Sequence, residues 1–164
     1  MLNTQLHDQL LNLLKKDQSA SQLNETEYKK IYADNTNILK EIINQYGWPT
    51  ISLVGQDGNE AAWFIAQHSD HDINFQKRCL LLLSAAFKKQ NEPKHHIAYL
   101  QDRISLNENR PQKFGTQIRY NHKTKQHEPY PPVESPERLD QLRMEHNLPP
   151  LDQYIDILSK FNKD

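Results

Sequence analysis

The chain has 164 residues, a length that fits one ordinary domain with a core of its own. Its 20 Lys and Arg residues nearly balance its 21 Asp and Glu residues, so charge gives no case for nucleic acid or an acidic membrane surface as a partner. Four glycines without a GxGxxG or GxxxxGK pattern argue against a phosphate-binding loop, and one cysteine, Cys79, excludes an internal disulfide.

We expect neither a secretion signal nor a membrane-spanning segment. No apolar stretch approaches the length of a membrane span. The N-terminal residues MLNTQLHDQLLNLLKK carry polar side chains on every turn, unlike the continuous apolar region of a secretion signal. The sequence therefore predicts a soluble, cytoplasmic protein with no membrane association.

The first half of the chain predicts helices. Leucines at helical spacing predict a helix over residues 4–16. Asn24, three residues before Glu27, resembles a capping box, and apolar residues at helical spacing continue from there to a stop at Gly47. The next segment, WPTISLVGQDGNE, is expected to be an extended connection with a turn at its DG pair.

Two further helices are expected before the middle of the chain. A short helix is predicted over residues 59–68, and another over residues 73–89. Between Cys79 and Phe87 the second of these is apolar nearly all round, so we place it at the centre of a helical bundle.

The second half of the chain changes texture. After a helix around Leu100, the alternation over residues 113–120 predicts a strand, and HEPYPPV is expected to return as an edge strand. Ser135-Pro136 predicts the start of a helix to about residue 146, and a last helix carries Tyr154. The predicted fold is mainly α: a single-domain helical bundle with one small β-hairpin near residues 112–133.

Polar residues gather at QHSDHD, between two predicted helices. Imidazoles and carboxylates at this density are metal ligands, but no firm spacing such as HExxH accompanies them, so we expect no bound metal. We expect Asp70 or Asp72 to cap the next helix and His71 to face water. His68 ends an apolar helix, where an imidazole serves either as a general base or as a satisfied core histidine.

A second polar cluster follows in AYLQDRI. Asp102 and Arg103 interrupt an apolar helical pattern, so each is expected to have a partner. An arginine held by an aspartate is a rigid fork for a carboxylate or phosphate, and the alternative is a salt bridge from the helix to the hairpin. Gln112 and Gln117 flank the FGT segment, where amides either contact a ligand or satisfy backbone groups.

Several segments occur in the order WPT-x4-G, EAAWFIAQHSD, FQ-x2-CL, AYLQDR, Q-x2-GTQ and LPPLDQY. Together they resemble a bacterial family of domains of unknown function. The resemblance covers roughly residues 48–154, which divides the expected domain, 1–164, into an N-terminal helical pair (1–46) and a family-like core (48–162). It implies that the core's polar residues form one motif set: His68, Asp102, Arg103 and Gln117.

Two hypotheses follow. In the first, a site between the central helices and the hairpin binds a small anionic or amide-containing ligand and suits hydrolysis or transfer, without a cofactor. Its catalytic residues are His68 and Asp102, and its ligand-binding residues are Arg103, Gln112, Gln117 and Gln67. In the second, the protein is a non-catalytic immunity or regulatory protein that binds another protein, and the polar residues form a structural network. The sequence leaves open whether the protein is an enzyme.

Overall fold

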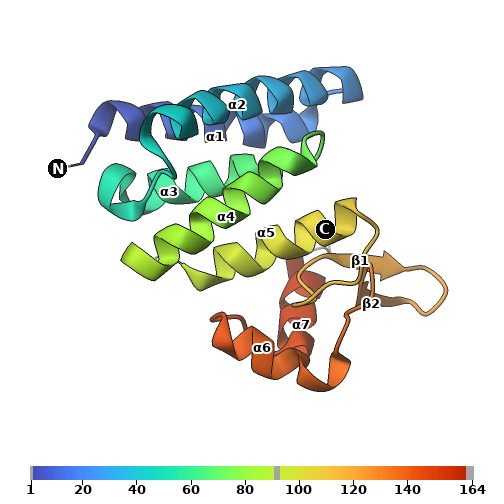
Figure 1. Cartoon of the computed structure of the whole chain (residues 1–164). Helices are drawn as coiled ribbons and strands as arrows, with labels where there is room; N and C mark the ends of the chain where they lie inside the picture. Colours follow the sequence, from blue (N-terminus) through green and yellow to red (C-terminus); the bar gives the residue numbers. More distant parts are fainter. Residues whose placement is uncertain (1, 91–92, 162–164) are drawn as a thin grey trace. The chain divides into compact units, whose positions relative to one another are not determined.

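The computed structural model describes residues 2–90 and 93–161, and the chain divides into two compact units, Met1–Pro93 and Lys94–Asp164 (Figure 1). Over the described residues the chain forms α-helices and one two-stranded antiparallel sheet. The prediction of a mainly α fold with one small hairpin is therefore confirmed, while the single domain stays a prediction. None of the helices in the described ranges is long and apolar enough to cross a membrane.

The first unit consists of helices packed on one another (Figure 1, blue to green). Helices α1 and α3 pack most extensively, and α2 contacts both of them. Leucines on one stripe of α1 and aliphatic residues of α2 and α3 form the core. The elements are α1 (Thr4–Ser19), η1 (Ala20–Gln22), α2 (Glu25–Tyr46), α3 (Ile51–Gln67) and α4 (Ile73–Gln90).

The caps of the first unit follow from its sequence. The Asn3 side chain accepts a hydrogen bond from the Leu6 N–H and begins α1. The predicted capping box of α2 is confirmed: the Asn24 side chain accepts from the Glu27 N–H at 3.1 Å, and the Glu27 carboxylate accepts from the Asn24 N–H at 3.4 Å. Gly47, at φ 76°, ends α2 as expected.

The predicted extended connection before residue 59 is wrong. Helix α3 already begins at Ile51, and Gly55 kinks it with φ 77° and ψ 171°, a conformation that only glycine adopts readily. Long-range hydrogen bonds stabilise this first turn, because the Asn3 N–H donates to the Leu53 carbonyl and the Asn59 side chain donates to the Pro49 carbonyl. Tertiary contacts therefore override the local turn signal at the DG pair.

The predicted bounds of α4 are close to those observed, but its place at the centre of a bundle is wrong in part. Cys79 and Leu83 are fully buried, whereas Leu81 is 73% exposed. The helix therefore has an outward apolar side chain in the middle of its leucine run.

The second unit joins one helix to a hairpin and two short C-terminal helices (Figure 1, yellow to red). Strands β1 and β2 pair antiparallel, with Ile118 opposite Pro129 and Asn121 opposite Gln126. A small core of Ala98, Phe114 and Leu148 lies among these elements. The elements are α5 (Lys94–Asn107), β1 (Ile118–Asn121), β2 (Gln126–Pro129), η2 (Pro136–Arg138), α6 (Leu139–Glu145) and α7 (Leu151–Phe161).

The strand expected over residues 113–120 is shorter than predicted. It begins only at Ile118, and residues 113–117 form a loop in which Gly115 adopts φ 61°. Hydrogen bonds from polar side chains of α5 and of the loop itself fix this segment in a loop conformation. The alternation of residue types was therefore not sufficient to form a strand here.

Candidate functional site

A histidine–aspartate pair lies at the end of α3. His68 is the C-cap of that helix, and its Nδ1 is hydrogen-bonded to Oδ2 of Asp17, near the end of α1. The Asp17 side chain is almost completely buried, while the His68 side chain is 33% exposed. An ionised carboxylate can only accept, so Nδ1 donates, and in the neutral form of the ring Nε2 carries the lone pair.

Asp17 has an unusual environment for a buried carboxylate. Its second oxygen, Oδ1, is buried without a hydrogen-bond partner among the described residues. A buried acceptor left unsatisfied costs about 1–3 kcal/mol, so this oxygen does not itself contribute to stability. Its clearest effect is to fix the orientation of the His68 ring.

The exposed part of His68 faces a cavity of about 470 Å³ between α2 and the loop after α3. The Tyr32 ring lies over the imidazole with 5.1 Å between centroids, and Tyr28 lies 5.6 Å from Tyr32. Two tyrosine rings therefore lie beside the His68 imidazole, which Asp17 holds in place. The cavity is lined by Tyr28, Lys29, Tyr32, Ala33, His68, Asp70 and His71.

The rest of the SDHD segment is structural. Asp72 accepts from the Phe75 N–H at 2.9 Å and pairs with Lys40 at 2.7 Å, so the predicted capping role is confirmed for Asp72. The hydrogen bond from Lys40 lowers the pKa of the Asp72 carboxyl. His71 is exposed, as expected. Within the described residues, no three His, Cys, Asp or Glu side chains gather to hold a metal ion.

The end of α3 is closed by a side-chain amide. Gln76 Nε2 donates to the carbonyls of Ala66 and Gln67 and to the Asp70 carboxylate, at 3.0–3.2 Å. The Gln67 side chain itself is buried and does not line the cavity beside His68. These contacts fix the backbone on which His68 stands.

Asp102 lies in the second unit and is completely buried. Its carboxylate accepts hydrogen bonds from the N–H groups of Lys113, Phe114 and Thr116 and from the Thr116 hydroxyl. Burial raises the pKa of the Asp102 carboxyl, and these donors act against that rise. The carboxylate therefore binds the loop before β1. One expectation from the sequence was instead a pair between Asp102 and Arg103.

The glutamines hold the same loop. Gln112 is fully buried; its Nε2 donates to the carbonyls of Gln117 and Pro131, and its Oε1 accepts from the Gln117 N–H. Arg103 donates to Oε1 of Gln117 at 3.2 Å, and Gln117 Nε2 donates to the Thr116 hydroxyl at 3.3 Å. Four of the predicted site residues, Asp102, Arg103, Gln112 and Gln117, thus meet around one loop.

Two buried charges were not anticipated. Asp17 continues the leucine stripe of Leu6, Leu10 and Leu13, so an acid on the apolar face of α1 was the available signal. Arg143 is fully buried and donates to the carbonyls of Phe114, Gly115 and Pro149. Four residues after Leu139, it likewise lies on a buried helical face.

The proposed site residues fall in both units. His68 and Gln67 lie in the first unit, and Asp102, Arg103, Gln112 and Gln117 lie in the second. The single site expected to contain them all stays a prediction. Within the first unit, the partner that orients His68 is Asp17.

Comparison with known proteins gives a family but no activity. No curated protein and no solved structure matches the chain. One family model matches residues 5–162 and so includes the N-terminal helices, which the sequence resemblance left out. The chain belongs to this family, which is described as a family of unknown function (DUF6624).

Proposed function

We propose that the first unit binds a small molecule in the cavity beside His68 and that His68 exchanges a proton with it. The observation that carries the proposal is the buried Asp17 carboxylate on Nδ1 of a partly exposed imidazole. This arrangement leaves Nε2 as a proton acceptor at the cavity. An oriented imidazole is the commonest general base near neutral pH.

The chemistry that fits is hydrolysis or transfer. None of the described residues that line the cavity is a serine, threonine or cysteine, so His68 acts on a water or a substrate hydroxyl. Nε2 takes the proton as that oxygen attacks an acyl or phosphoryl group, and the imidazolium then returns the proton to the leaving group. Asp17 stabilises the imidazolium formed between the two steps.

The cavity also indicates the shape of the ligand. Tyr28 and Tyr32 offer aromatic surface next to the imidazole, so the ligand has a planar or apolar body. The wider proposal, in which Arg103, Gln112 and Gln117 contact the same anionic or amide-containing ligand, is separate and is not needed for proton transfer at His68.

Two chromogenic probes test the proposal. p-Nitrophenyl acetate and p-nitrophenyl phosphate present an acyl and a phosphoryl group on the same planar body. We expect one of them to be hydrolysed faster than in buffer, with a loss of about 100-fold in His68→Gln and of about 10-fold or more in Asp17→Asn. His122→Gln is the matched control, because it removes an exposed imidazole of the hairpin turn, outside this cavity, and should change the rate less than about twofold.

The outcomes separate the proposal from its rival. Absence of hydrolysis above buffer, or equal losses in His68→Gln and His122→Gln, would refute it. The second candidate is a non-catalytic interaction protein, and the network around Asp102 favours it, since polar residues there are satisfied internally. In that case neither histidine variant changes a rate, and Asp102 substitutions act on stability only.

A further inference from the structure

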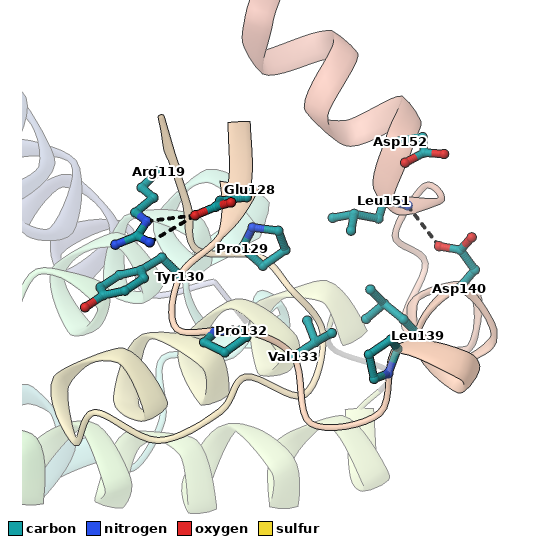
Figure 2. Close-up of a pocket in the computed structure, with 11 residues that line it drawn as sticks. Arg119, Glu128, Pro129, Tyr130, Pro132, Val133, Leu139, Asp140, Leu151 and Asp152 are labelled. Atoms are coloured by element: carbon teal, nitrogen blue, oxygen red, sulfur yellow. Dashed lines mark hydrogen bonds and ion pairs between the residues drawn. The ribbon is translucent and has the colours of Figure 1, made fainter. Parts of the chain in front are cut away.

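A second cavity, independent of His68, lies within the second unit. It is a groove of about 530 Å³ between the end of the hairpin and the start of α7 (Figure 2). Ligand pockets typically have volumes of about 300–1,000 Å³, so the groove has room for a small organic molecule. Figure 2 shows Arg119, Glu128 and Tyr130 on one side of it and Asp140 and Asp152 on the other.

The floor of the groove is apolar and closely packed. A Cβ atom on Gly115 would lie 3.1 Å from Val133, 3.5 Å from Pro129 and 3.6 Å from Leu151, so these three lining residues converge over the glycine. The loop that carries Gly115 is fixed by the buried side chains of Asp102, Gln112 and Arg143. The floor is therefore formed before any ligand binds, which lowers the entropic cost of binding.

The charges of the groove are uneven. At the hairpin end, Arg119 pairs with Glu128 at 2.9 Å, and its guanidinium lies 3.6 Å from the Tyr130 ring centre. The positive charge of Arg119 and the negative charge of Glu128 cancel, and the guanidinium already contacts Glu128 and the Tyr130 ring. An anionic ligand would therefore have to break an existing pair.

The opposite end keeps a negative charge. Asp140 accepts from the Leu151 N–H at 2.9 Å, and Asp152 is exposed in the first turn of α7; neither forms an ion pair within the described residues. The start of α7 supplies roughly half a positive charge, which is less than two carboxylates carry. Buried Arg143 acts electrostatically on Asp140, but the same guanidinium is also offset by Asp102.

We propose that this groove binds a small amphiphilic amine. The apolar body of the amine lies on Val133 and Leu151, and its ammonium group faces Asp140 and Asp152. We expect an amine to bind more tightly than an anion, because the carboxylates of Asp140 and Asp152 give the groove a net negative charge. We also expect it to bind more tightly than an apolar ligand of the same shape, because only the amine has an ammonium group that attracts these carboxylates. This site shares no residue with the cavity beside His68.

The test is an NMR titration of the whole chain with three probes of one shape. Phenethylamine, 2-phenylethanol and 3-phenylpropionate share a phenyl body and differ in charge. We expect phenethylamine to shift the amide signals of Val133 and Leu151 and to bind about tenfold more tightly than 3-phenylpropionate, with an affinity that falls as salt rises. The alcohol should lie between the two.

Conservative variants localise the charge effect. Asp152→Asn and Asp140→Asn remove one charge each, and the amide oxygen introduced at position 140 can still accept from the Leu151 N–H. We expect each variant to weaken phenethylamine binding about threefold to tenfold. Asp156→Asn is the matched control, because it removes an exposed acid of α7 outside the groove and should leave the affinity unchanged.

The proposal is overturned if phenethylamine leaves the groove amides unshifted, if 3-phenylpropionate binds equally well, or if Asp156→Asn weakens binding as much as Asp152→Asn. His68→Gln should leave phenethylamine binding unchanged. The amine site and the proposed proton transfer can therefore fail independently of each other.

Discussion

Removal of the Asp102 carboxylate gives the sharpest test of how the second unit is held together. In Asp102→Ala, three buried or half-buried N–H groups and the Thr116 hydroxyl lose their acceptor. A hydrogen bond to a charged group contributes about 1.5–3 kcal/mol, and rearrangement of the loop with entry of water recovers part of the loss. We expect a net decrease of about 4 kcal/mol in the free energy of unfolding, in the range found when one partner is removed from a buried charged contact.

The Arg103→Ala variant shows whether the loop amides or the arginine hold the Asp102 carboxylate. The half-buried hydrogen bond from Arg103 to Gln117 contributes about 1 kcal/mol, and Arg103 does not hold the loop amides, so Arg103→Ala should destabilise less than Asp102→Ala. Urea unfolding measures both variants, and amide hydrogen exchange at Lys113, Phe114 and Thr116 should accelerate in Asp102→Ala alone. If Arg103→Ala destabilises as much as Asp102→Ala, the guanidinium and not the loop amides holds the carboxylate, and the assignment is refuted.

Three further predictions concern the backbone and pH. Gly55→Ala should cost about 2 kcal/mol in urea unfolding, because φ is 77° and the new Cβ would lie 3.2 Å from Asp57 Oδ1; an unchanged midpoint would contradict the kink. Burial lowers the pKa of His96 to about 3, so stability should be lost as pH falls from about 6.5 towards 3, and His96→Leu should flatten this loss in pH-dependent melts. Hydrogen bonds to Asp8 and Asp57 raise the pKa of His7, so its contribution is complete below about pH 6.5 and is lost as pH rises through the higher folded pKa. In His7→Gln the melting temperature should no longer fall across that higher window; a fall equal to that of the parent chain would contradict the assignment.

The helices were predictable where local signals and packing agree. In α2 the capping box, the apolar stripe and Gly47 all indicate the same bounds, and the structure has them. In residues 51–58 the local signals indicated a turn, but contacts from Asn3 and Asn59 stabilise a helical turn on the near side of Gly55. No local pattern contains those partners.

In the loop before β1, long-range contacts likewise override the local pattern, and here a predicted strand is a loop. Residues 113–120 alternate as a strand does, yet the amides of Lys113, Phe114 and Thr116 are hydrogen-bonded to Asp102 and are not paired in a strand. The sequence did indicate that Asp102 needed a partner. It did not indicate which partner, because nearly every residue type has a backbone N–H group and the sequence does not show which of these groups lie near Asp102.

Of the two residues of the candidate pair, only His68 was predicted from the sequence. His68 stood out by its position at the end of an apolar helix, whereas its partner Asp17 lies 51 positions earlier in the chain. The periodicity of α1 contained the signal, since an acid there occupies the fourth place of a buried leucine stripe. A charge on an apolar stripe is a better guide to such a pair than the density of polar residues in a loop.

The contrast between the two buried carboxylates leads to a last prediction. Asp102 is satisfied by several donors, whereas Asp17 has His68 and one oxygen without a partner among the described residues. Replacement of a poorly satisfied buried charge by an apolar residue is often neutral or stabilising by about 1–4 kcal/mol. Asp17→Leu extends the leucine stripe of α1, and His68 is exposed enough to be solvated without its partner.

We therefore expect Asp17→Leu to unfold at an equal or higher urea concentration than the parent chain while its hydrolysis of the p-nitrophenyl probes falls to the level of His68→Gln. Asp102→Leu is the matched control and should destabilise strongly, because the same change there strands the loop donors. A stable Asp17→Leu with full activity would show that the carboxylate does not orient His68 for catalysis. A strongly destabilised Asp17→Leu would assign Asp17 to the fold, since removal of a residue retained for function alone leaves stability unchanged or raises it.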